Sequence, residues 1–314
     1  MDKYYIGIDI GGTAVKIGLV NCNGTLLATS TASVNFDHYQ TPIIDTVLKE
    51  TDNFLNDNKI SLTDIHGIGV SATGQVNTHN GCITGTAGHI ANWLDTPISQ
   101  ILSQHYQKPV TVANDANCAA FGEKWMGAAK SHSNVIMITI GTGVGGGIIV
   151  NNTILSGSIG IAGELGHFSI KKDGIPCSCG NVGCLEQYAS TTALVRRVRE
   201  SNFVATSNVL PQDINGKYIF QQVAKGNLEL QDLLDDWIAD IAVGITGLVH
   251  IFNPSLIVVG GGVSHQEDLF IKPLSEKIYS SVMPSFSKDL TICSAQLGNN
   301  AGILGAVANH LSSL

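Results

Sequence analysis

The chain has few charged residues and lacks the uninterrupted apolar segments that span membranes. Only 13% of its 314 residues are Asp, Glu, Lys or Arg, whereas 44% are hydrophobic. This composition is typical of a folded protein with a sizeable core and not of a disordered chain. Two stretches, 131–163 and 241–266, contain no Asp, Glu, Lys or Arg. Glycine, Ser and Asn interrupt the first and Asn253-Pro254 the second, so we interpret both as buried sheet and helix segments.

Other absences restrict the class of protein. The net charge is −8 and the isoelectric point is near 5.6. The sequence therefore lacks the excess of positive charge that is typical of nucleic-acid-binding proteins. Asp9 and Lys16 interrupt the N-terminal apolar run, so no signal peptide is recognised. The chain has seven cysteines, and the four that are scattered along it are expected to be small buried thiols in a reducing compartment. These features predict a soluble, cytoplasmic protein that binds neither nucleic acid nor a membrane.

Two nucleotide-binding motifs are excluded. No segment matches G-x-x-x-x-G-K-[ST], so the chain is not a P-loop protein. Residues Gly141–Gly146 formally match G-x-G-x-x-G. In a dinucleotide-binding fold a helix follows this turn, whereas here the apolar run Gly147–Val150 indicates a strand.

A pattern of strands and turns occurs twice, 130 residues apart. Residues 4–10 predict a strand, Gly11-Gly12 a turn, and residues 15–20 and 25–30 two further strands. Residues 135–140, 141–146, 147–150 and 153–155 repeat this order. We interpret the pattern as a duplicated unit, each copy building one lobe. Apolar spacing predicts helices at 41–56, 115–128, 185–200, 228–252 and 299–312, and a buried strand at 256–259.

Three glycine turns follow strong strands, and tight hairpins are the structural alternative for each. Glycine lets the backbone approach a phosphate closely and aim its N–H groups at it. Asp9 ends an apolar strand at the first turn, where we expect it near Mg²⁺ and phosphates, with turn capping as the alternative. Thr13 and Lys16 could add a hydroxyl and a cation. The residues that we expect at a nucleotide or its phosphates are Asp9, Gly11, Gly12, Thr13, Lys16, Gly141, Thr142, Gly143, Gly261 and Gly262.

The pair Asn114-Asp115 stands at a predicted strand-to-helix junction. Catalytic groups of α/β proteins often lie at such junctions, although Asn and Asp are also the best helix N-caps. The phosphate-type turns elsewhere in the chain favour the catalytic interpretation. Asp115 would deprotonate a substrate hydroxyl that attacks a phosphoryl group, while Asn114 holds a neighbouring hydroxyl.

One imidazole and three thiols lie within 18 residues, at His167, Cys177, Cys179 and Cys184. Tetrahedral zinc prefers such a set of ligands, and the alternatives are buried thiols or a disulfide, which a reducing compartment disfavours. Two carboxylates, Glu164 and Glu186, flank the group. A structural zinc would fix one ring nitrogen of His167 and leave the other for a ligand. Two acceptors and one donor on a rigid loop suit a polyhydroxylated ligand such as a sugar.

Together these residues resemble the ROK family (repressor, open reading frame, kinase) of sugar kinases. The resemblance spans the whole chain, and its most specific part is C-x-C-G-x-x-G-C-x-E at Cys177–Glu186. It implies an α/β, two-lobed actin/hexokinase-like ATPase fold of duplicated ribonuclease H-like domains. The expected lobes are 1–112 plus 299–314, and 113–298. ATP would lie between them, with Mg²⁺ bridging its phosphates and Zn²⁺ held by the Cys/His group.

The resemblance also implies roles for single residues. Asp115 would be the general base of a kinase that phosphorylates a hexose or N-acyl hexosamine, most readily at O6. The residues that would bind the sugar are Gly74, Asn114, Glu164, His167 and Glu186. Because the first expected strand begins within four residues of Met1, no N-terminal helix-turn-helix of the family's repressors is expected. Homodimers or homotetramers are common in the family.

The identity of the sugar stays open. Around Gly88–Trp93, many glucokinase-like members have Asn where this chain has His89. This difference weakens the case for strict glucose preference and leaves N-acetylmannosamine kinase and β-glucoside kinase as alternatives. A catalytically silent, sugar-sensing ROK protein is the further alternative.

Overall fold

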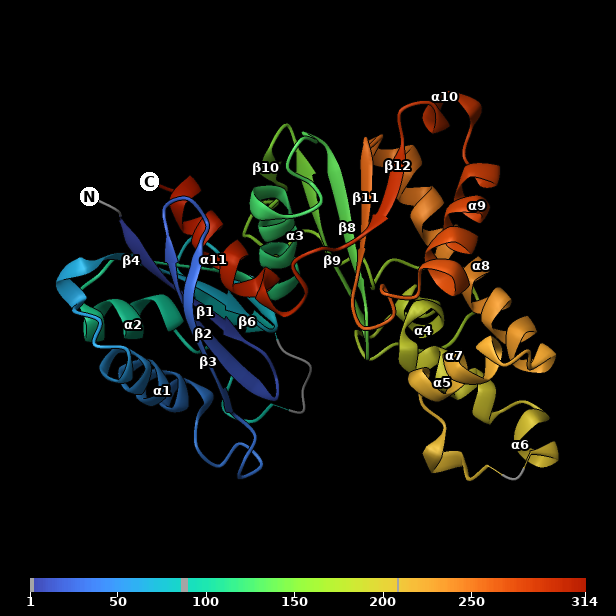
Figure 1. The fold of residues 1–314 in the computed structure, drawn as a ribbon, viewed down its shortest axis with the longest axis horizontal. Coiled ribbons are helices and arrows are strands. Elements are labelled where there is room, and N and C mark those ends of the chain that lie inside the picture. Colours follow the sequence, from blue (N-terminus) through green and yellow to red (C-terminus); the bar gives the residue numbers. More distant parts are fainter. Residues whose placement is uncertain (1–2, 86–89, 208) are drawn as a thin grey trace. The chain divides into compact units, whose positions relative to one another are not determined.

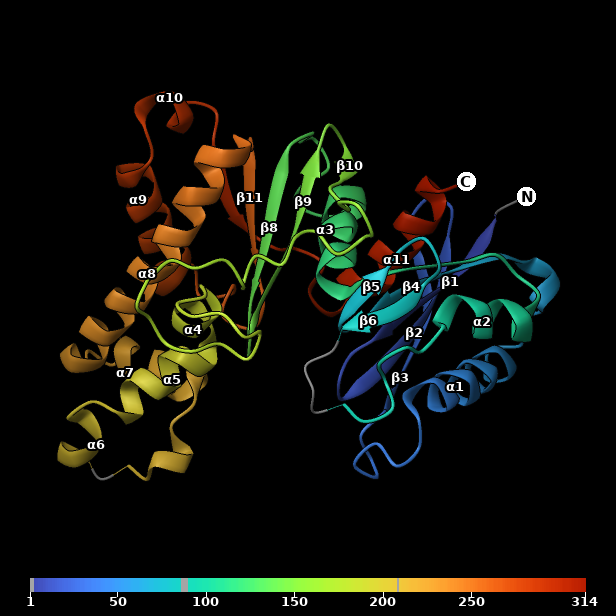
Figure 2. The same cartoon turned by 180° about the vertical axis from the view of Figure 1, so that it is seen from behind.

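The computed structural model describes residues 3–85, 90–207 and 209–314 of the chain. Its contacts divide the chain into two compact units. Unit 1 comprises 1–131, 147–163 and 296–314, and unit 2 comprises 132–146 and 164–295. The described residues form two five-stranded sheets, each with helices beside it (Figures 1 and 2). His89, on which the sugar preference was argued, lies outside the described residues.

The contact-defined units divide the chain at other positions than the expected lobes. Residues 113–131 and 147–163 were expected in the second lobe and belong to unit 1 by their contacts. For 113–131 the reason is that helix α3 (Asp115–Met126) packs along helix α11 (Ala301–Ser312).

The sheet of unit 1 contains five strands among the described residues, in the order β3-β2-β1-β4-β7. The strands are β1 (Tyr4–Ile10), β2 (Ala14–Asn21), β3 (Leu26–Ser33), β4 (Ile65–Ala72) and β7 (Val110–Asn114). The first three form an antiparallel meander. Strands β4 and β7 run parallel to β1, so the carboxyl ends of β1, β4 and β7 meet at one edge. A hairpin of β5 (Gln75–Asn77) and β6 (Cys82–Gly85) follows β4.

Helices cover both faces of this sheet. Helices α1 (Ile43–Asp57) and α2 (Ile98–Tyr106) pack on one face, where Ile8 belongs to the main core. On the other face Tyr5 packs against Ile303 and Val307 of α11. Strand residues therefore alternate between two helix layers, as a sheet buried on both sides requires.

Glycine allows α11 to lie directly on the strands. A Cβ atom at Gly69 of β4 would lie 2.1 Å from the carbonyl oxygen of Ala306, and one at Gly7 of β1 would lie 2.6 Å from that of Ile303. Any side chain there would push the helix off the sheet. The close packing brings the first turn of α11 to the end of β1 that carries Asp9, since a Cβ atom at Gly302 would lie 2.4 Å from the carboxylate of Asp9.

The second sheet repeats the arrangement of the first. Among the described residues its order is β10-β9-β8-β11-β12. Its strands are β8 (Val135–Ile140), β9 (Val144–Val150), β10 (Thr153–Ile154), β11 (Leu256–Gly260) and β12 (Thr291–Ser294). Strands β11 and β12 run parallel to β8, and β10 is antiparallel to β9. In both sheets the order is thus third, second, first, fourth and fifth strand, which confirms the duplication predicted from the 130-residue offset.

Unit 2 is otherwise mostly helical. Its helices are α4 (Glu186–Ala189), α5 (Thr191–Arg199), α6 (Phe203–Thr206), α7 (Gly216–Ala224), α8 (Leu228–Phe252), α9 (Lys272–Ser281) and α10 (Pro284–Ser287). The long helix α8 is the centre of the core: Trp237 is fully buried, and its ring lies 5.1 Å from that of Phe270. Its indole N–H donates to the carbonyl of Ser190 at 3.0 Å. None of the helices in the described part of the chain combines the length and apolarity that a bilayer crossing needs.

Two helix boundaries have clear local causes. The expected helix 185–200 is interrupted because Ser190 is extended and its hydroxyl caps α5, accepting the N–H of Ala193 at 3.1 Å. Helix α8 ends at Asn253, which adopts the left-handed conformation (φ 44°) immediately before Pro254. Asn tolerates that conformation better than other side chains, and the residue before proline is disfavoured in a helix.

Candidate functional site

The first glycine turn joins β1 to β2 and lies beside Asp9. The antiparallel register pairs Asp9 with Lys16, whose ammonium lies 3.3 Å from Oδ2 of the aspartate. The hydroxyl of Ser71, on the parallel neighbour β4, donates to Oδ1 at 2.7 Å. The turn closes with the N–H of Gly11 on the carbonyl of Ala14 at 2.9 Å. Asp9 is therefore a held carboxylate at the carboxyl edge of the sheet.

The tip of this turn is fixed from outside. The hydroxyl of Tyr39 donates to the carbonyl of Gly12 at 2.5 Å, and the N–H of Val34 donates to the carbonyl of Thr13 at 3.0 Å. The structure thus places Gly11, Gly12 and Thr13 on one fixed turn next to Asp9 and Lys16.

Asn114 and Asp115 stand at the junction of β7 and α3, as expected from the sequence. Asn114 is the N-cap of α3: its Oδ1 accepts the N–H groups of Ala116 and Asn117 at 2.9 and 3.2 Å. Its Nδ2 donates to the carbonyl of Gly74 at 2.9 Å. The carboxylate of Asp115 accepts the N–H of Ala116 at 2.8 Å. Asn114 thus has the helix-capping role that the sequence left open as the alternative for this pair.

Asp9 and Asp115 both act on one buried thiol. Burial raises the pKa of Cys118 well above its usual range, and the negative charges of Asp9 and Asp115 raise it further. The thiol therefore stays protonated. Gly74, which holds Asn114, has a left-handed backbone (φ 96°), and a Cβ atom there would lie 2.6 Å from the carbonyl of Gly85. Unit 1 thus gathers Asp9, Asp115 and Gly74 around the carboxyl edge of its sheet.

The second glycine turn joins β8 to β9 in unit 2. It closes with the N–H of Gly141 on the carbonyl of Gly143 at 2.9 Å. The chain after the cysteine cluster holds the turn from outside: Oε2 of Glu186 accepts the N–H of Val144 at 3.0 Å, and the hydroxyl of Thr192 donates to the carbonyl of Thr142 at 2.7 Å.

The third glycine turn follows β11. Gly261 has a left-handed backbone (φ 91°), and a Cβ atom there would lie 2.1 Å from the carbonyl of Ile140. Only glycine fits this close approach of the two turns. Gly262 follows with open space at its Cβ position.

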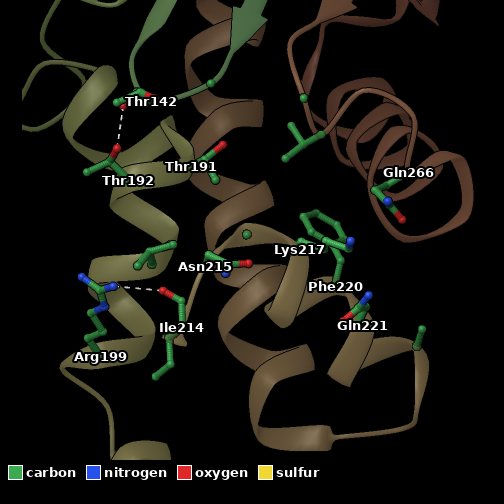
Figure 3. A pocket seen from close by; sticks show the side chains of 16 residues that line it. Thr142, Thr191, Thr192, Arg199, Ile214, Asn215, Lys217, Phe220, Gln221 and Gln266 are labelled. Atoms are coloured by element: carbon green, nitrogen blue, oxygen red, sulfur yellow. Dashed lines mark hydrogen bonds between the residues drawn. The ribbon is translucent and has the colours of Figure 1, made fainter. Parts of the chain in front are cut away.

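These two turns open on a pocket of about 860 Å³ in unit 2 (Figure 3). Gly141, Thr142 and Gly262, all expected at a nucleotide, line it together. The other residues that line it are Thr191, Thr192, Val195, Arg199, Ile214, Asn215, Gly216, Lys217, Phe220, Gln221, Ala224, Val263 and Gln266.

The pocket suits an anion. Its lining includes two cationic side chains, Arg199 and Lys217, and no acidic one. Two helices begin at it, α5 after the Ser190 cap and α7 after the Asn215 cap. The unpaired N–H groups and the dipole at a helix N-terminus favour negative charge.

The four predicted metal ligands meet in unit 2. One ligand atom each of His167, Cys177, Cys179 and Cys184 lies within 4.8 Å of the others. Nδ1 of His167 is 3.6 Å from Sγ of Cys177, and Sγ of Cys179 is 3.6 Å from Sγ of Cys184. Zn–S bonds of about 2.3 Å in a tetrahedron put sulfur atoms roughly 3.8 Å apart. The donor set and its spacing therefore fit zinc.

The environment of the sulfurs favours a bound cation. Burial alone raises the pKa of Cys177, but hydrogen bonds from Cys179 and His167 outweigh it and bring the pKa to about 6. Burial and the neighbouring thiols raise the pKa of Cys184. Three thiols this close cannot all ionise alone, and a divalent cation at their centre favours the thiolate form of each. The side-chain amide of Gln187 lies 3.7 Å from Sγ of Cys177 as a further donor.

Backbone hydrogen bonds join the segments that carry the two predicted sugar-binding carboxylates. The N–H of Glu186 donates to the carbonyl of Gly166 at 2.9 Å, and that of His167 to the carbonyl of Glu164 at 3.0 Å. Glu164, His167 and Glu186 thus lie on two adjacent backbone segments. Glu164 is exposed, and among the described residues its carboxylate has no hydrogen-bond partner.

The sequence matches the ROK family over residues 5–311. The chain belongs to the ROK family. The glucokinase of Thermotoga maritima is 32% identical over 313 residues, covering 96% of both chains. The crystal structure of a ROK family glucokinase from Streptomyces griseus in complex with glucose and AMPPNP is 32% identical. It superposes with a TM-score of 0.81 and covers 96% of this chain and 97% of that one. The xylose repressor of Caldicellulosiruptor bescii is 29% identical, covering 98% of this chain and 78% of the repressor.

Membership of the ROK family confirms the family recognised from the motifs, and with it the actin/hexokinase-like ATPase fold. Sequence reasoning missed most of the pocket lining in this ROK protein. Thr191 and Thr192 directly follow the Ser190 cap, and Asn215-Gly216 begins α7. The available signal was the capping pattern Ser-Thr-Thr and Asn-Gly at two helix starts, but segment 201–227 had no strong apolar period to reveal α7.

Proposed function

We propose that this ROK protein transfers the γ-phosphoryl group of ATP to a hydroxyl of a hexose or N-acyl hexosamine, with O6 as the expected acceptor and Asp115 as general base. Family membership and the glucokinase relatives support an ATP-dependent sugar kinase. The residue roles and the class of sugar are our proposal.

The observation that carries the proposal is the cationic pocket of unit 2. Two glycine turns, two helix N-termini and the side chains of Arg199 and Lys217 line one cavity that has no acidic residue. We assign this pocket to ATP. Gly141 and Thr142 would face its phosphates and Gly262 its nucleoside. The volume of about 860 Å³ is within the range of small-molecule sites.

The sugar would be bound by the residues named from the sequence. Glu164 and Glu186 are acceptors and His167 is a donor through the ring nitrogen that faces away from the cluster. Asn114 has a narrower role than expected, because its Oδ1 caps α3 and its Nδ2 already donates once. It can therefore act only through the remaining N–H. Gly74 would line the site by its backbone.

In the proposed reaction the sugar hydroxyl oxygen attacks the γ-phosphorus while the bond to ADP breaks, and the hydroxyl proton passes to the carboxylate of Asp115. The hydrogen bond from Ala116 N–H to Oδ1 holds that carboxylate at the start of α3. Asp115 and Asn114 are thus oriented by the same helix end, which fixes the base relative to its neighbour.

Two metal ions are part of the proposal. Mg²⁺ supplies charge neutralisation on the phosphates, and Asp9 is the carboxylate that would face it, held by Ser71 and Lys16. Zn²⁺ supplies rigidity to the loop that carries Glu164, His167 and Glu186. Its ligands would be His167, Cys177, Cys179 and Cys184, whose atoms converge.

Replacing the base tests the mechanism. We expect Asp115→Asn to lower turnover roughly 10²- to 10⁴-fold, because an amide cannot accept the proton. Its affinity for the sugar should change little, since the substitution keeps the size and the capping hydrogen bond. Steady-state kinetics by coupled ADP release and sugar titration by calorimetry measure the two effects.

The matched control is Asp57→Asn, the same substitution at an exposed carboxylate near the end of α1. It should leave turnover unchanged. Near-normal turnover of Asp115→Asn would remove Asp115 as the base.

A panel of sugars tests the function itself. Glucose, mannose, fructose, N-acetylglucosamine, N-acetylmannosamine and cellobiose are each supplied with Mg-ATP, and ADP release is followed. One sugar well above the ATP-only rate identifies the acceptor class, and ³¹P–¹H correlation on the product identifies the phosphorylated hydroxyl. Cellobiose alone would favour a β-glucoside kinase.

The match to xylose repressors supports a second candidate, a sugar-sensing protein without catalysis. Tight sugar binding with no phosphorylated product would favour it. The intact Asn114-Asp115 pair and the pocket with its glycine turns favour the kinase.

A further inference from the structure

The glycine turn at the nucleotide pocket is held by the segment that follows the cysteine cluster. Three hydrogen bonds join them: Val144 N–H to Oε2 of Glu186 at 3.0 Å, Thr191 N–H to the Gly141 carbonyl at 2.8 Å, and the Thr192 hydroxyl to the Thr142 carbonyl at 2.7 Å. The last of these is drawn in Figure 3. Every residue of the turn from Gly141 to Val144 except Gly143 is thus bonded to residues 186–192.

Gly143 contributes through the absence of a side chain. Its backbone does not adopt positive φ, so conformational freedom does not explain the glycine. A Cβ atom there would lie 2.5 Å from Oε2 of Glu186. The glycine therefore makes room for the carboxylate that bonds the next N–H. By contrast, a Cβ atom at Gly141 would meet nothing within 4 Å.

Glu186 also belongs to the proposed sugar site. It stands two residues after the cluster residue Cys184, and its N–H bonds the carbonyl of Gly166, next to His167. Only one of its carboxylate oxygens is bonded to the turn, since the hydrogen bond from Val144 N–H goes to Oε2. Oε1 is left as the acceptor for a sugar hydroxyl.

We propose that Glu186 and Thr192 are positioning residues of the nucleotide site, and that Glu186 serves both substrates, holding the phosphate turn with one oxygen and the sugar with the other. The proposal rests on the assignment of the pocket to ATP. It extends the role of Glu186 beyond the sugar and adds Thr192, which no sequence motif indicated. Changes at Glu186 should therefore affect nucleotide and sugar together.

Thr192→Val tests whether the contact with Thr142 supports nucleotide binding, and it leaves the proposed sugar-binding residues unchanged. It removes the hydroxyl donor at nearly constant volume, so the carbonyl of Thr142 loses its partner. We expect the dissociation constant of Mg-AMPPNP to rise about three- to tenfold, as for loss of one neutral hydrogen bond. Thr192→Ser should restore most of the affinity because it keeps the hydroxyl. Titration calorimetry with Mg-AMPPNP and, separately, glucose gives both affinities.

The control for this variant is Thr206→Val in α6, whose hydroxyl also bonds backbone carbonyls and which does not line the pocket. It should leave AMPPNP affinity unchanged.

Three carboxylate variants separate the two roles of Glu186. Glu186→Ala should weaken both Mg-AMPPNP and sugar about tenfold. Glu186→Gln keeps an oxygen acceptor for Val144 N–H, so nucleotide affinity should stay within about threefold of the wild type. Glu164→Ala removes an exposed carboxylate with no contact to the turn and should weaken sugar alone.

Each outcome decides the proposal. Unchanged AMPPNP affinity in both Thr192→Val and Glu186→Ala would overturn it, because the turn would then keep its shape without these contacts. If the Glu186→Ala protein fails to fold, the comparison of Thr192→Val with Thr192→Ser tests the proposal. If the wild-type protein binds AMPPNP but phosphorylates no sugar, the proposed function is contradicted. The positioning proposal is then still decided by the AMPPNP titrations, because binding is measured without turnover.

Discussion

At the scale of single residues, His310 combines burial with an unused nitrogen. The side chain is 1% exposed, its Nδ1 lies 3.2 Å from the Thr111 hydroxyl, and its Nε2 has no partner among the described residues. Burial lowers its pKa below the usual value of about 6.5. Gly67 permits this packing, because a Cβ atom there would lie within 2.0 Å of Nε2.

This burial predicts a pH-dependent stability. The unfolded chain binds a proton at His310 below about pH 6.5 while the folded chain does not, so the free energy of unfolding falls as pH falls through that value. The slope from this group is at most about 1.4 kcal/mol per pH unit and vanishes below the folded-state pKa. Urea unfolding of the wild type and of His310→Gln between pH 7 and pH 5 measures it. The variant should be less stable at pH 7 and lose less stability on acidification.

The control is His66→Gln, an exposed histidine on the neighbouring strand β4. Its pH profile should match that of the wild type. Parallel profiles for wild type and His310→Gln would contradict a neutral buried imidazole.

The residue types in the sequence indicated which side chains belong to the candidate site, but not the contacts that these side chains make. The convergence of the four predicted metal ligands could be expected from their chemistry and spacing alone. The contact of Glu186 with Val144 could not be predicted in this way, because the two residues are 42 positions apart in the sequence. Asn114 illustrates the same limit: sequence allowed either capping or binding, and only the structure shows the cap. Contacts between segments distant in sequence depend on packing that local patterns do not encode.

At the scale of secondary-structure elements, a buried carboxylate joins the end of α3 to the segment before α11. Glu123 is fully buried. Its Oε2 accepts the N–H of Ala128, and its Oε1 accepts those of Gln296 and Leu297, all at 2.8 Å. Both segments lie near points where the chain passes between the compact units, at 131/132 and 295/296, which are two of the four such points. Glu123 thus fixes two connections at once.

Removing this carboxylate should be costly. Glu123→Ala would leave three N–H groups without their acceptor, and we expect a loss of roughly 3 kcal/mol or more in the free energy of unfolding. Glu123→Gln keeps one oxygen acceptor and should lose less. Urea unfolding followed by circular dichroism measures both.

The matching control is Glu276→Ala on helix α9, an exposed glutamate, for which a change within about 0.5 kcal/mol is expected. Equal effects at the two positions would argue against Glu123 as a buried anchor.

Elements with a strong apolar period were predictable from sequence. Helix α8 has the predicted bounds, and strand β8 agrees residue for residue. Segment 201–227 was predicted only as helix plus loops, without the bounds of α7, helix α9 was not predicted, and α5 was merged with α4. The reasons are physical: the buried residues of α7 are only Ile219, Phe220 and Val223, and the break at Ser190 depends on a side-chain cap. Short elements are held by tertiary contacts more than by their own sequence.

At the scale of the whole molecule, duplication explains why two glycine turns occupy equivalent places. Each sheet begins with a meander whose first turn carries glycines, Gly11-Gly12 in unit 1 and Gly141–Gly143 in unit 2. The copies have since diverged. The first turn has a carboxylate at Asp9, whereas the second is held by a carboxylate from elsewhere in the unit, Glu186. The cysteine cluster belongs to unit 2, so its effects should be local to that unit.

Metal removal tests this locality. A chelator, or Cys179→Ser, should remove about one equivalent of zinc per chain, because three remaining ligands hold it far less tightly. Hydrogen exchange should then speed up in residues 164–192, since the proposed metal would join His167 to the three cysteines within that segment. The amides of β1 and β4 in unit 1 should keep their protection. Zinc content by atomic absorption and exchange by mass spectrometry are the measurements.

The same treatment links the metal to the nucleotide. Residues 186–192 hold the turn Gly141–Val144, so loosening them should weaken Mg-AMPPNP binding as well as sugar binding, and activity should fall with both. Cys22→Ser, at an exposed cysteine outside the cluster, should keep zinc, exchange pattern and activity. Purified protein without zinc, or full activity after complete removal, would contradict a structural metal. If exchange instead rose equally in both units, the metal would stabilise the whole fold, because the units would then unfold as one.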